Sequence, residues 1–144
     1  MKRIALLSVV SLMLASAIFA PVALAQQTGE VDVQSVTLTA GGAVTVKGTL
    51  VCVPGSYYDV TVDVRQRTSG NVYNIASVYT NSTVSDKLCP DTGLLEFEAS
   101  GFGRVGEISK PFHRGPAIIE PRSYVCDPSG CKDWQGAIEA VKIS

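Results

Sequence analysis

Alternation of apolar and polar residues over the segment 57–67 constrains the fold more than any other feature of the sequence. The segment reads YYDVTVDVRQR, and it places Tyr58, Val60, Val62 and Val64 on one face. Because successive side chains of a β-strand point to opposite faces, the pattern predicts a strand with one buried face. Its predicted exposed face consists of Asp59, Thr61, Asp63, Arg65 and Arg67.

Further segments show the same period of two residues, and we expect strands over 33–40, 43–53, 72–80, 82–89, 94–100, 116–126 and 136–144. Gly-Gly, Pro-Gly, Ser-Gly and Pro-Asp-Thr-Gly, which are typical turn sequences, separate several of them. We expect residues 101–115 to form a glycine-rich connection. Pro121 lies within the expected strand 116–126, so this strand needs an edge position or a bulge there. For the segment 72–80, the sequence does not decide which alternate residues are buried. A hairpin loop of two or four residues would bury Tyr73, Ile75 and Tyr79, whereas a loop of odd length would expose them.

Seven to eight short antiparallel strands with frequent turns, and no convincing helical period, predict the fold class. We expect an all-β chain that folds as an immunoglobulin-like β-sandwich.

The N-terminal segment has the pattern of a secretory signal peptide. Lys2 and Arg3 precede an apolar run over 4–19, and Ala23-Leu24-Ala25 gives the small-x-small pattern of a cleavage site. We therefore expect residues 1–25 to be removed and residues 26–144 to form one secreted domain without a membrane span. We expect an extracellular localisation, or a periplasmic one in a host with two membranes. Ten basic residues against 13 acidic ones leave a mature net charge of −3, which disfavours nucleic acid as a partner.

All four cysteines lie in the predicted mature domain, and an even number in an exported chain predicts disulfides. Sequence alone permits three pairings. The turn sequence Asp-Pro-Ser-Gly at 127–130 places Cys126 opposite Cys131 across a hairpin, and Cys52 then pairs with Cys89 by elimination. Such a bridge from an early strand to a middle one would pin the two sheets together. Zinc ligation is disfavoured, because Cys52 and Cys89 form no second close pair.

Several segments resemble the uncharacterised secreted immunoglobulin-like domains of actinobacteria, a family without an assigned function. They are VTVKGTLVCVPGSYYDVTVDVRQR, LCPDTGLLEFEAS, FHRGPAIIE and CDPSGCKDWQGAIEAVKIS, in that order over residues 31–144. The resemblance implies a bacterial, exported β-sandwich with the same disulfide pairing. Relatives often carry a tryptophan after the second cysteine, where this chain has Leu94 and Leu95. A fainter likeness, to neocarzinostatin-type apoproteins, lies in the short cysteine hairpin before EAVKIS, and no ligand pocket is carried over from it.

Candidate catalytic residues are few, and we expect no enzyme, no metal site and no cofactor. His113 is the sole histidine, and no nucleophile elbow, zinc-binding helix or phosphate loop accompanies it. We interpret it as a solvent-facing loop residue. Paired acids would serve a glycosidase, but on strands such acids are more often solvated. The acids in question are Asp59, Asp63, Glu96 and Glu98.

Tyrosines and arginines are the better candidates for a binding role, because both are enriched at binding surfaces. The candidate binding residues are Tyr57, Arg65, Arg67, Tyr73, Tyr79, Arg104, His113 and Arg114, and Tyr124 and Arg122 follow the same pattern. Our first hypothesis is a non-enzymatic interaction or structural module for an extracellular protein, glycan or cell-surface component. The alternatives are a small-molecule carrier with a cleft between its sheets, and an inhibitor of secreted hydrolases that presents CDPSGC or residues 101–115.

Overall fold

The chain folds as a two-layered, all-β structure, as the alternation predicts. The structure is a computed structural model that describes residues 27–144, so the predicted signal peptide lies outside the described residues. The smaller sheet has the order β1 (Val31–Leu38), β2 (Val44–Val51), β5 (Leu94–Gly101). The larger sheet has the order β10 (Glu139–Ile143), β8 (Gly115–Asp127), β3 (Tyr57–Ser69), β4 (Val72–Asn81), β6 (Gly103–Val105), β7 (Ile108–Lys110).

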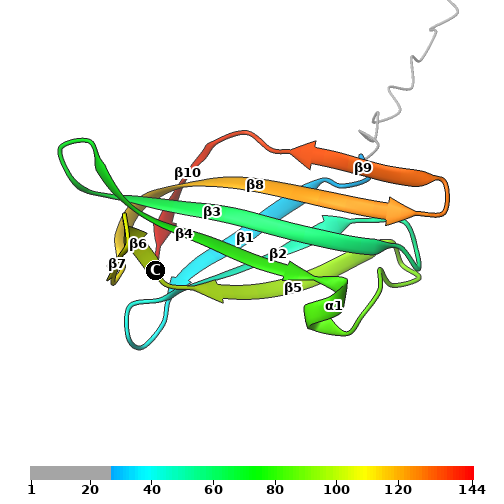
Figure 1. Cartoon of the computed structure of the whole chain (residues 1–144), viewed down its shortest axis with the longest axis horizontal. Coiled ribbons are helices and arrows are strands. Elements are labelled where there is room, and N and C mark those ends of the chain that lie inside the picture. Colours follow the sequence, from blue (N-terminus) through cyan, green and yellow to red (C-terminus); the bar gives the residue numbers. More distant parts are fainter. Residues whose placement is uncertain (1–26) are drawn as a thin grey trace, which may run out of the picture.

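A further strand, β9 (Gly130–Gln135), pairs with β8 and forms the hairpin at one end of the molecule, whereas β6 and β7 lie at the other (Figure 1). All of these pairings are antiparallel. The described chain has ten strands rather than seven or eight, because the connection 101–115 contains β6 and β7 and because β9 precedes the predicted last strand, whereas the strand predicted over 82–89 does not form. The antiparallel all-β fold with two disulfides is confirmed.

The core lies between the two sheets and consists of the alternating apolar residues of each strand. Val60, Val62 and Val64 of β3 face Val46 and Leu50 of β2, and all five are buried. The predicted inward residues of β5, from Leu95 to Ala99, are also buried. Burial of such side chains contributes about 1.5–3 kcal/mol each to folding, so the alternation itself fixes which sheet faces meet.

One predicted strand, over residues 82–89, is wrong. Residues Ser82–Ser85 form the single-turn helix α1, and a loop follows it. The Asn81 side-chain oxygen accepts a hydrogen bond from the Val84 N–H at 2.8 Å, which caps the helix. Asp86 then adopts a left-handed backbone conformation with φ 51° and ends it. Among residues 27–144, no helix is long and apolar enough to cross a bilayer.

Both disulfides form as predicted, between Cys126 and Cys131 and between Cys52 and Cys89. All four cysteines are therefore bonded, which excludes the zinc interpretation. The long bridge does not join two strands of opposite sheets. It joins the β2–β3 connection to the connection before β5, and both of these connections pass between the sheets at one end of the sandwich. The disulfide thus links the two connections that run from one sheet to the other at this end.

Pro121 occupies a gap in the pairing of β8. On one side it faces Val62 of β3, and on the other side β9 reaches only Arg122 while β10 reaches only Ile119. The Pro121 carbonyl accepts a hydrogen bond from the Gly136 N–H across this gap. In an antiparallel strand the N and O of one residue point to the same side, so the missing N–H of Pro121 also faces the gap. Pro121 therefore occupies a position like that of an edge strand, as the sequence predicts, because no neighbouring strand needs its N–H.

Candidate binding surface

A β-bulge in β3 decides which side chains of β4 reach the surface. The β3–β4 register shifts between Arg67 and Ser69, so that Thr68 has no opposite residue. Arg67 then pairs with Tyr73, and the odd residues of β4 share a face with the odd residues of β3. Tyr73, Ile75 and Tyr79 consequently point away from the core, and the ambiguity left by the sequence is resolved in favour of exposure.

Four tyrosines therefore lie on one face, which we call the outer face of the large sheet. Their exposed fractions run from 39% for Tyr73 to 64% for Tyr57, with Tyr79 and Tyr124 between them. Arg65, Arg67 and Arg122 belong to the same face by register. The solvent-exposed face of a sheet normally carries polar side chains. Four exposed aromatic rings on one such face therefore suggest a contact surface.

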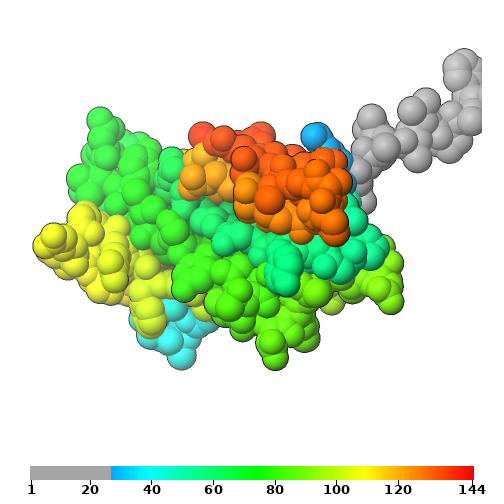
Figure 2. All heavy atoms as spheres, turned by 45° about the vertical axis from the view of Figure 1, so that its right-hand side comes forward, coloured from blue at the N-terminus to red at the C-terminus, as the bar shows by residue number. Residues whose placement is uncertain are grey.

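The candidate residues of the loop region 101–115 lie in two different places on the molecule. Arg104 of β6 pairs with Ile75 of β4, so it extends the outer face. His113 and Arg114 do not join it, and Arg114 instead lines a separate hollow with Lys142 and the C-terminal Ser144. The His113 side chain is exposed, while its backbone N–H and C=O both bond to the buried Gln66 side chain, at 3.0 and 2.7 Å. Figure 2 shows this end of the molecule, with the loop in yellow beside the green β3–β4 hairpin.

A charged network occupies the middle of the outer face. Asp63 is only 6% exposed, which corrects the prediction that it is an ordinary solvated residue. Its carboxylate accepts hydrogen bonds from the Ser77 hydroxyl and the Arg122 guanidinium, and Arg65 lies 3.5 Å away. Arg65 also donates to Glu120 at 2.9 Å. The network immobilises both arginine side chains, which lowers the entropy that they would lose on binding a ligand.

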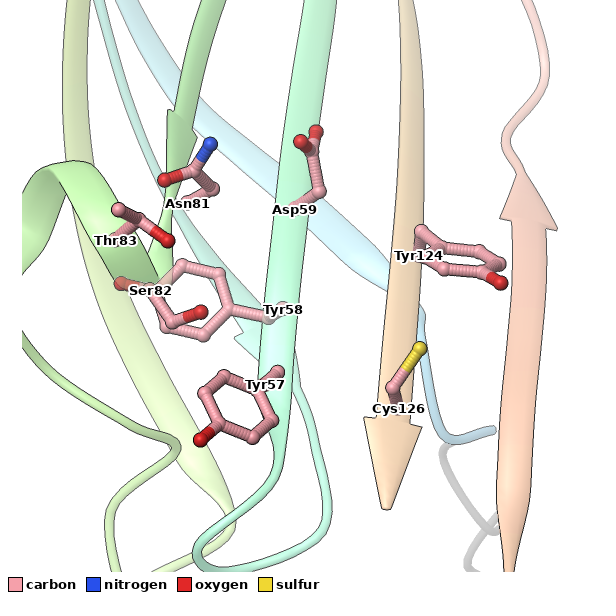
Figure 3. A pocket seen from close by; sticks show the side chains of 8 residues that line it. All are labelled: Tyr57, Tyr58, Asp59, Asn81, Ser82, Thr83, Tyr124 and Cys126. Atoms are coloured by element: carbon pink, nitrogen blue, oxygen red, sulfur yellow. The ribbon is translucent and has the colours of Figure 1, made fainter.

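A hollow of about 280 Å³ lies at the β9 end of this face, and Tyr57, Tyr58 and Tyr124 all line it. Figure 3 shows the Asp59 carboxylate between the amide of Asn81 and the ring of Tyr124. A neighbouring hollow of about 230 Å³ shares Asp59 and Tyr124 with it, so the two are adjacent. The residues that line the first are Tyr57, Tyr58, Asp59, Asn81, Ser82, Thr83, Tyr124 and Cys126, and those of the second include Thr61, Arg122, Ser123 and Asp133.

The opposite end of the outer face carries a hollow of a different character. Tyr73, Arg65 and Arg67 line it together with apolar side chains of β8 and β10, and its volume is about 300 Å³. This end is cationic, because Arg104 lies next to it on β6. The β9 end carries the carboxylates Asp59 and Asp133 instead. The two ends of one face therefore present opposite charge.

The acids proposed for hydrolysis do not converge. Asp59 and Asp63 lie on the outer face of the large sheet, whereas Glu96 and Glu98 lie on the opposite side of the molecule, on β5 of the small sheet. Within the described part of the chain, no three His, Cys, Asp or Glu side chains form a group that could hold a metal ion. These four carboxylates thus do not meet in a single group.

The sequence pattern indicated Tyr57, Tyr73, Tyr79, Arg65 and Arg67, and the structure brings these five together on one face. The sequence analysis did not identify Asn81 of β4, Glu120 of β8 or Asp133 of β9 as polar partners of this surface, because no local pattern shows which strands lie side by side. Comparison of the chain with protein-family models, curated proteins and solved structures gives no match. The assignment of a function therefore depends on the geometry of this surface.

Proposed function

We propose that the chain is a secreted, non-enzymatic binding module, and that the outer face of the large sheet contacts an extracellular partner. One observation carries the proposal: four exposed tyrosines and three arginines, from β3, β4 and β8, share this face. Tyrosine gives a large, rigid contact area at low entropic cost, and its hydroxyl remains bonded to water or to a ligand. The signal-peptide pattern and the two disulfides support action in an oxidising, extracellular environment.

The packing of the sandwich favours surface binding over a carrier function. The space between the sheets is filled by aliphatic side chains such as Val44, Leu50 and Ile119, which are fully buried. The hollows described above open outward from the faces of the sheets. A carrier would need a concave, mostly apolar pocket that encloses its ligand.

The proposal is tested by sedimentation of the protein with the cell envelope of its host. Protein purified from the culture medium of cells expressing the full chain is mixed with washed envelopes, and the bound fraction is measured. The variant Tyr57→Ala/Tyr79→Ala removes two rings from the outer face, whereas Lys47→Ala/Glu98→Ala alters an exposed ion pair on the small sheet. We expect the first variant to lose retention and the second to keep it. Equal retention of all three proteins, or none by the wild type, would overturn the proposal.

A further inference from the structure

The β9 end of the outer face presents a row of four side chains across four adjacent strands. Asp133 of β9 pairs with Tyr124 of β8, Tyr124 pairs with Asp59 of β3, and Asp59 pairs with Asn81 of β4. Neighbouring strands are about 4.8 Å apart, so the row extends over roughly 14 Å. We call it the Asp133–Asn81 row. Its sequence of chemical groups is carboxylate, aromatic ring, carboxylate and amide.

The cap of helix α1 fixes the orientation of the amide in this row. The Oδ1 atom of Asn81 accepts from the Val84 N–H at 2.8 Å, so the NH2 group must point the other way. In Figure 3 the amide nitrogen faces the side of Asp59. Its NH2 group makes no hydrogen bond to any residue between 27 and 144, and it remains free to donate to a ligand.

The carboxylate beside this amide is equally available. Asp59 makes one long contact, 3.4 Å from the Thr61 hydroxyl, which leaves most of its acceptor capacity unused. The floor below the two groups is rigid, because the Tyr58 hydroxyl bonds to the Ser85 hydroxyl at 2.5 Å and Ser85 donates to the Asn81 carbonyl at 2.9 Å. A donor of fixed orientation therefore lies next to a carboxylate whose acceptor capacity is largely free.

We infer that the Asp133–Asn81 row is a binding site for a neutral glycan. The inference rests on the proposed function and names the class of ligand. Two neighbouring sugar hydroxyls match the pair of polar groups, since one hydroxyl donates to the Asp59 carboxylate and the other accepts from the Asn81 amide. The ring of Tyr124 packs against the apolar C–H face of the sugar, and Tyr57, diagonally adjacent at about 7–8 Å, reaches the next unit.

Charge excludes an anionic polysaccharide from the same row. Asp59 and Asp133 each repel a carboxylate or sulfate, and Arg122, which lines the neighbouring hollow, is already bonded to Asp63. The other end of the face would attract such a polymer instead, because Arg67 and Arg104 there form no ion pair within residues 27–144, whereas Arg65 is bonded to Glu120. The choice between neutral and anionic glycans is thus a choice between the two ends of one face.

Affinity electrophoresis of the purified protein tests the inference, in native gels that contain xylan, glucomannan or mixed-linkage β-glucan, with alginate as the anionic probe. We expect at least one neutral polysaccharide to retard the wild type and alginate not to do so. Tyr124→Ala should weaken retardation about fivefold or more, because truncation of a central aromatic contact costs at least about 1 kcal/mol. Asn81→Asp keeps the oxygen that caps α1 but replaces the donor with an acceptor, and it should weaken retardation similarly.

Tyr73→Ala is the matched control, since it removes an exposed tyrosine from the other end of the same face. It should leave retardation within twofold of the wild type, and circular dichroism with thermal melting checks that each variant folds. Loss of retardation in Tyr73→Ala but not in Tyr124→Ala would overturn the inference, as would retardation by alginate alone. If no polysaccharide retards the wild type while the envelope assay still depends on the outer face, the glycan inference fails and the proposed function stands. If the envelope assay is negative as well, both fail.

Discussion

Removal of the Asp63 carboxylate should destabilise the fold far more than removal of an exposed acid, although both residues form ion pairs on strands. Asp63 is 6% exposed and is bonded to Arg122 and Ser77. Breaking a fully buried pair by removing one partner costs about 3–5 kcal/mol. The side chains of Arg65 and Arg122 remain 34% and 46% exposed, so water compensates part of the loss. We therefore expect Asp63→Ala to lower the free energy of unfolding by about 2 kcal/mol.

The matched control is Glu98→Ala, which breaks the pair with Lys47 on the small sheet. Both partners are more than half exposed, and such surface pairs contribute between about 0 and 1 kcal/mol. The loss in free energy of unfolding for Asp63→Asn should lie between those of the two alanine variants, because the amide retains a hydrogen-bond acceptor for Ser77 but loses the charge.

Urea unfolding followed by the fluorescence of Trp134, the sole tryptophan, measures these differences. Trp134 is half-buried and packs against the core, so its emission reports on folding. With a slope of about 1–3 kcal/mol per molar urea, Asp63→Ala should lower the midpoint by roughly 1 M. A midpoint shift for Asp63→Ala no larger than that for Glu98→Ala would refute the reasoning, since burial would then add nothing to the pair. A double-mutant cycle with Arg122→Ala isolates the coupling between the two side chains.

Three further predictions concern stability and titration. Alanine at both Cys52 and Cys89 removes a cross-link over 37 residues, and chain entropy predicts a loss of about 4 kcal/mol in urea unfolding, about twice that for the short bridge. Gly48→Ala would place its Cβ 2.3 Å from a backbone oxygen of β1, so calorimetry should show a lower Tm, with a loss of about 2–3 kcal/mol. Hydrogen bonds from the hydroxyl and N–H of Ser129 lower the pKa of Asp127 below its ordinary 3.8. The associated stabilisation is present above that value and is lost as the pH falls through the folded pKa, and NMR titration of Ser129→Ala should show the Asp127 pKa rising.

Local patterns in the sequence were sufficient to predict much of the fold. The strand over 57–67 and its buried valines follow directly from alternation, because a period of two residues can bury one face only in a strand. The hairpin of Cys126 and Cys131 follows from the Asp-Pro-Ser-Gly turn between them, and its register pairs the two cysteines directly. The wrong strand over 82–89 arose where a single capped helical turn competes with extended backbone, and four residues are too few to show a helical period.

The candidate site depended on information that the sequence carries only weakly. The tyrosines and arginines were recognised as residue types, but one bulged residue, Thr68, places Tyr73 and Tyr79 of β4 on the same face as the others. A shift of one position moves every side chain of a strand to the other face, so Tyr73 and Tyr79 could not be placed from alternation alone. Asp63 illustrates the same limit, because its burial comes from arginines of β3 and β8 that fold over it.

The sequence by itself determined most of the long strands, several of the turns and the Cys126–Cys131 hairpin, because these properties depend on neighbours within a few residues. Only the tertiary structure decided which polar groups meet across β9, β8, β3 and β4 to form the Asp133–Asn81 row. These four residues are up to 74 positions apart in the chain. Their contact depends on strand order and register, which follow from the packing of the whole core rather than from any local pattern.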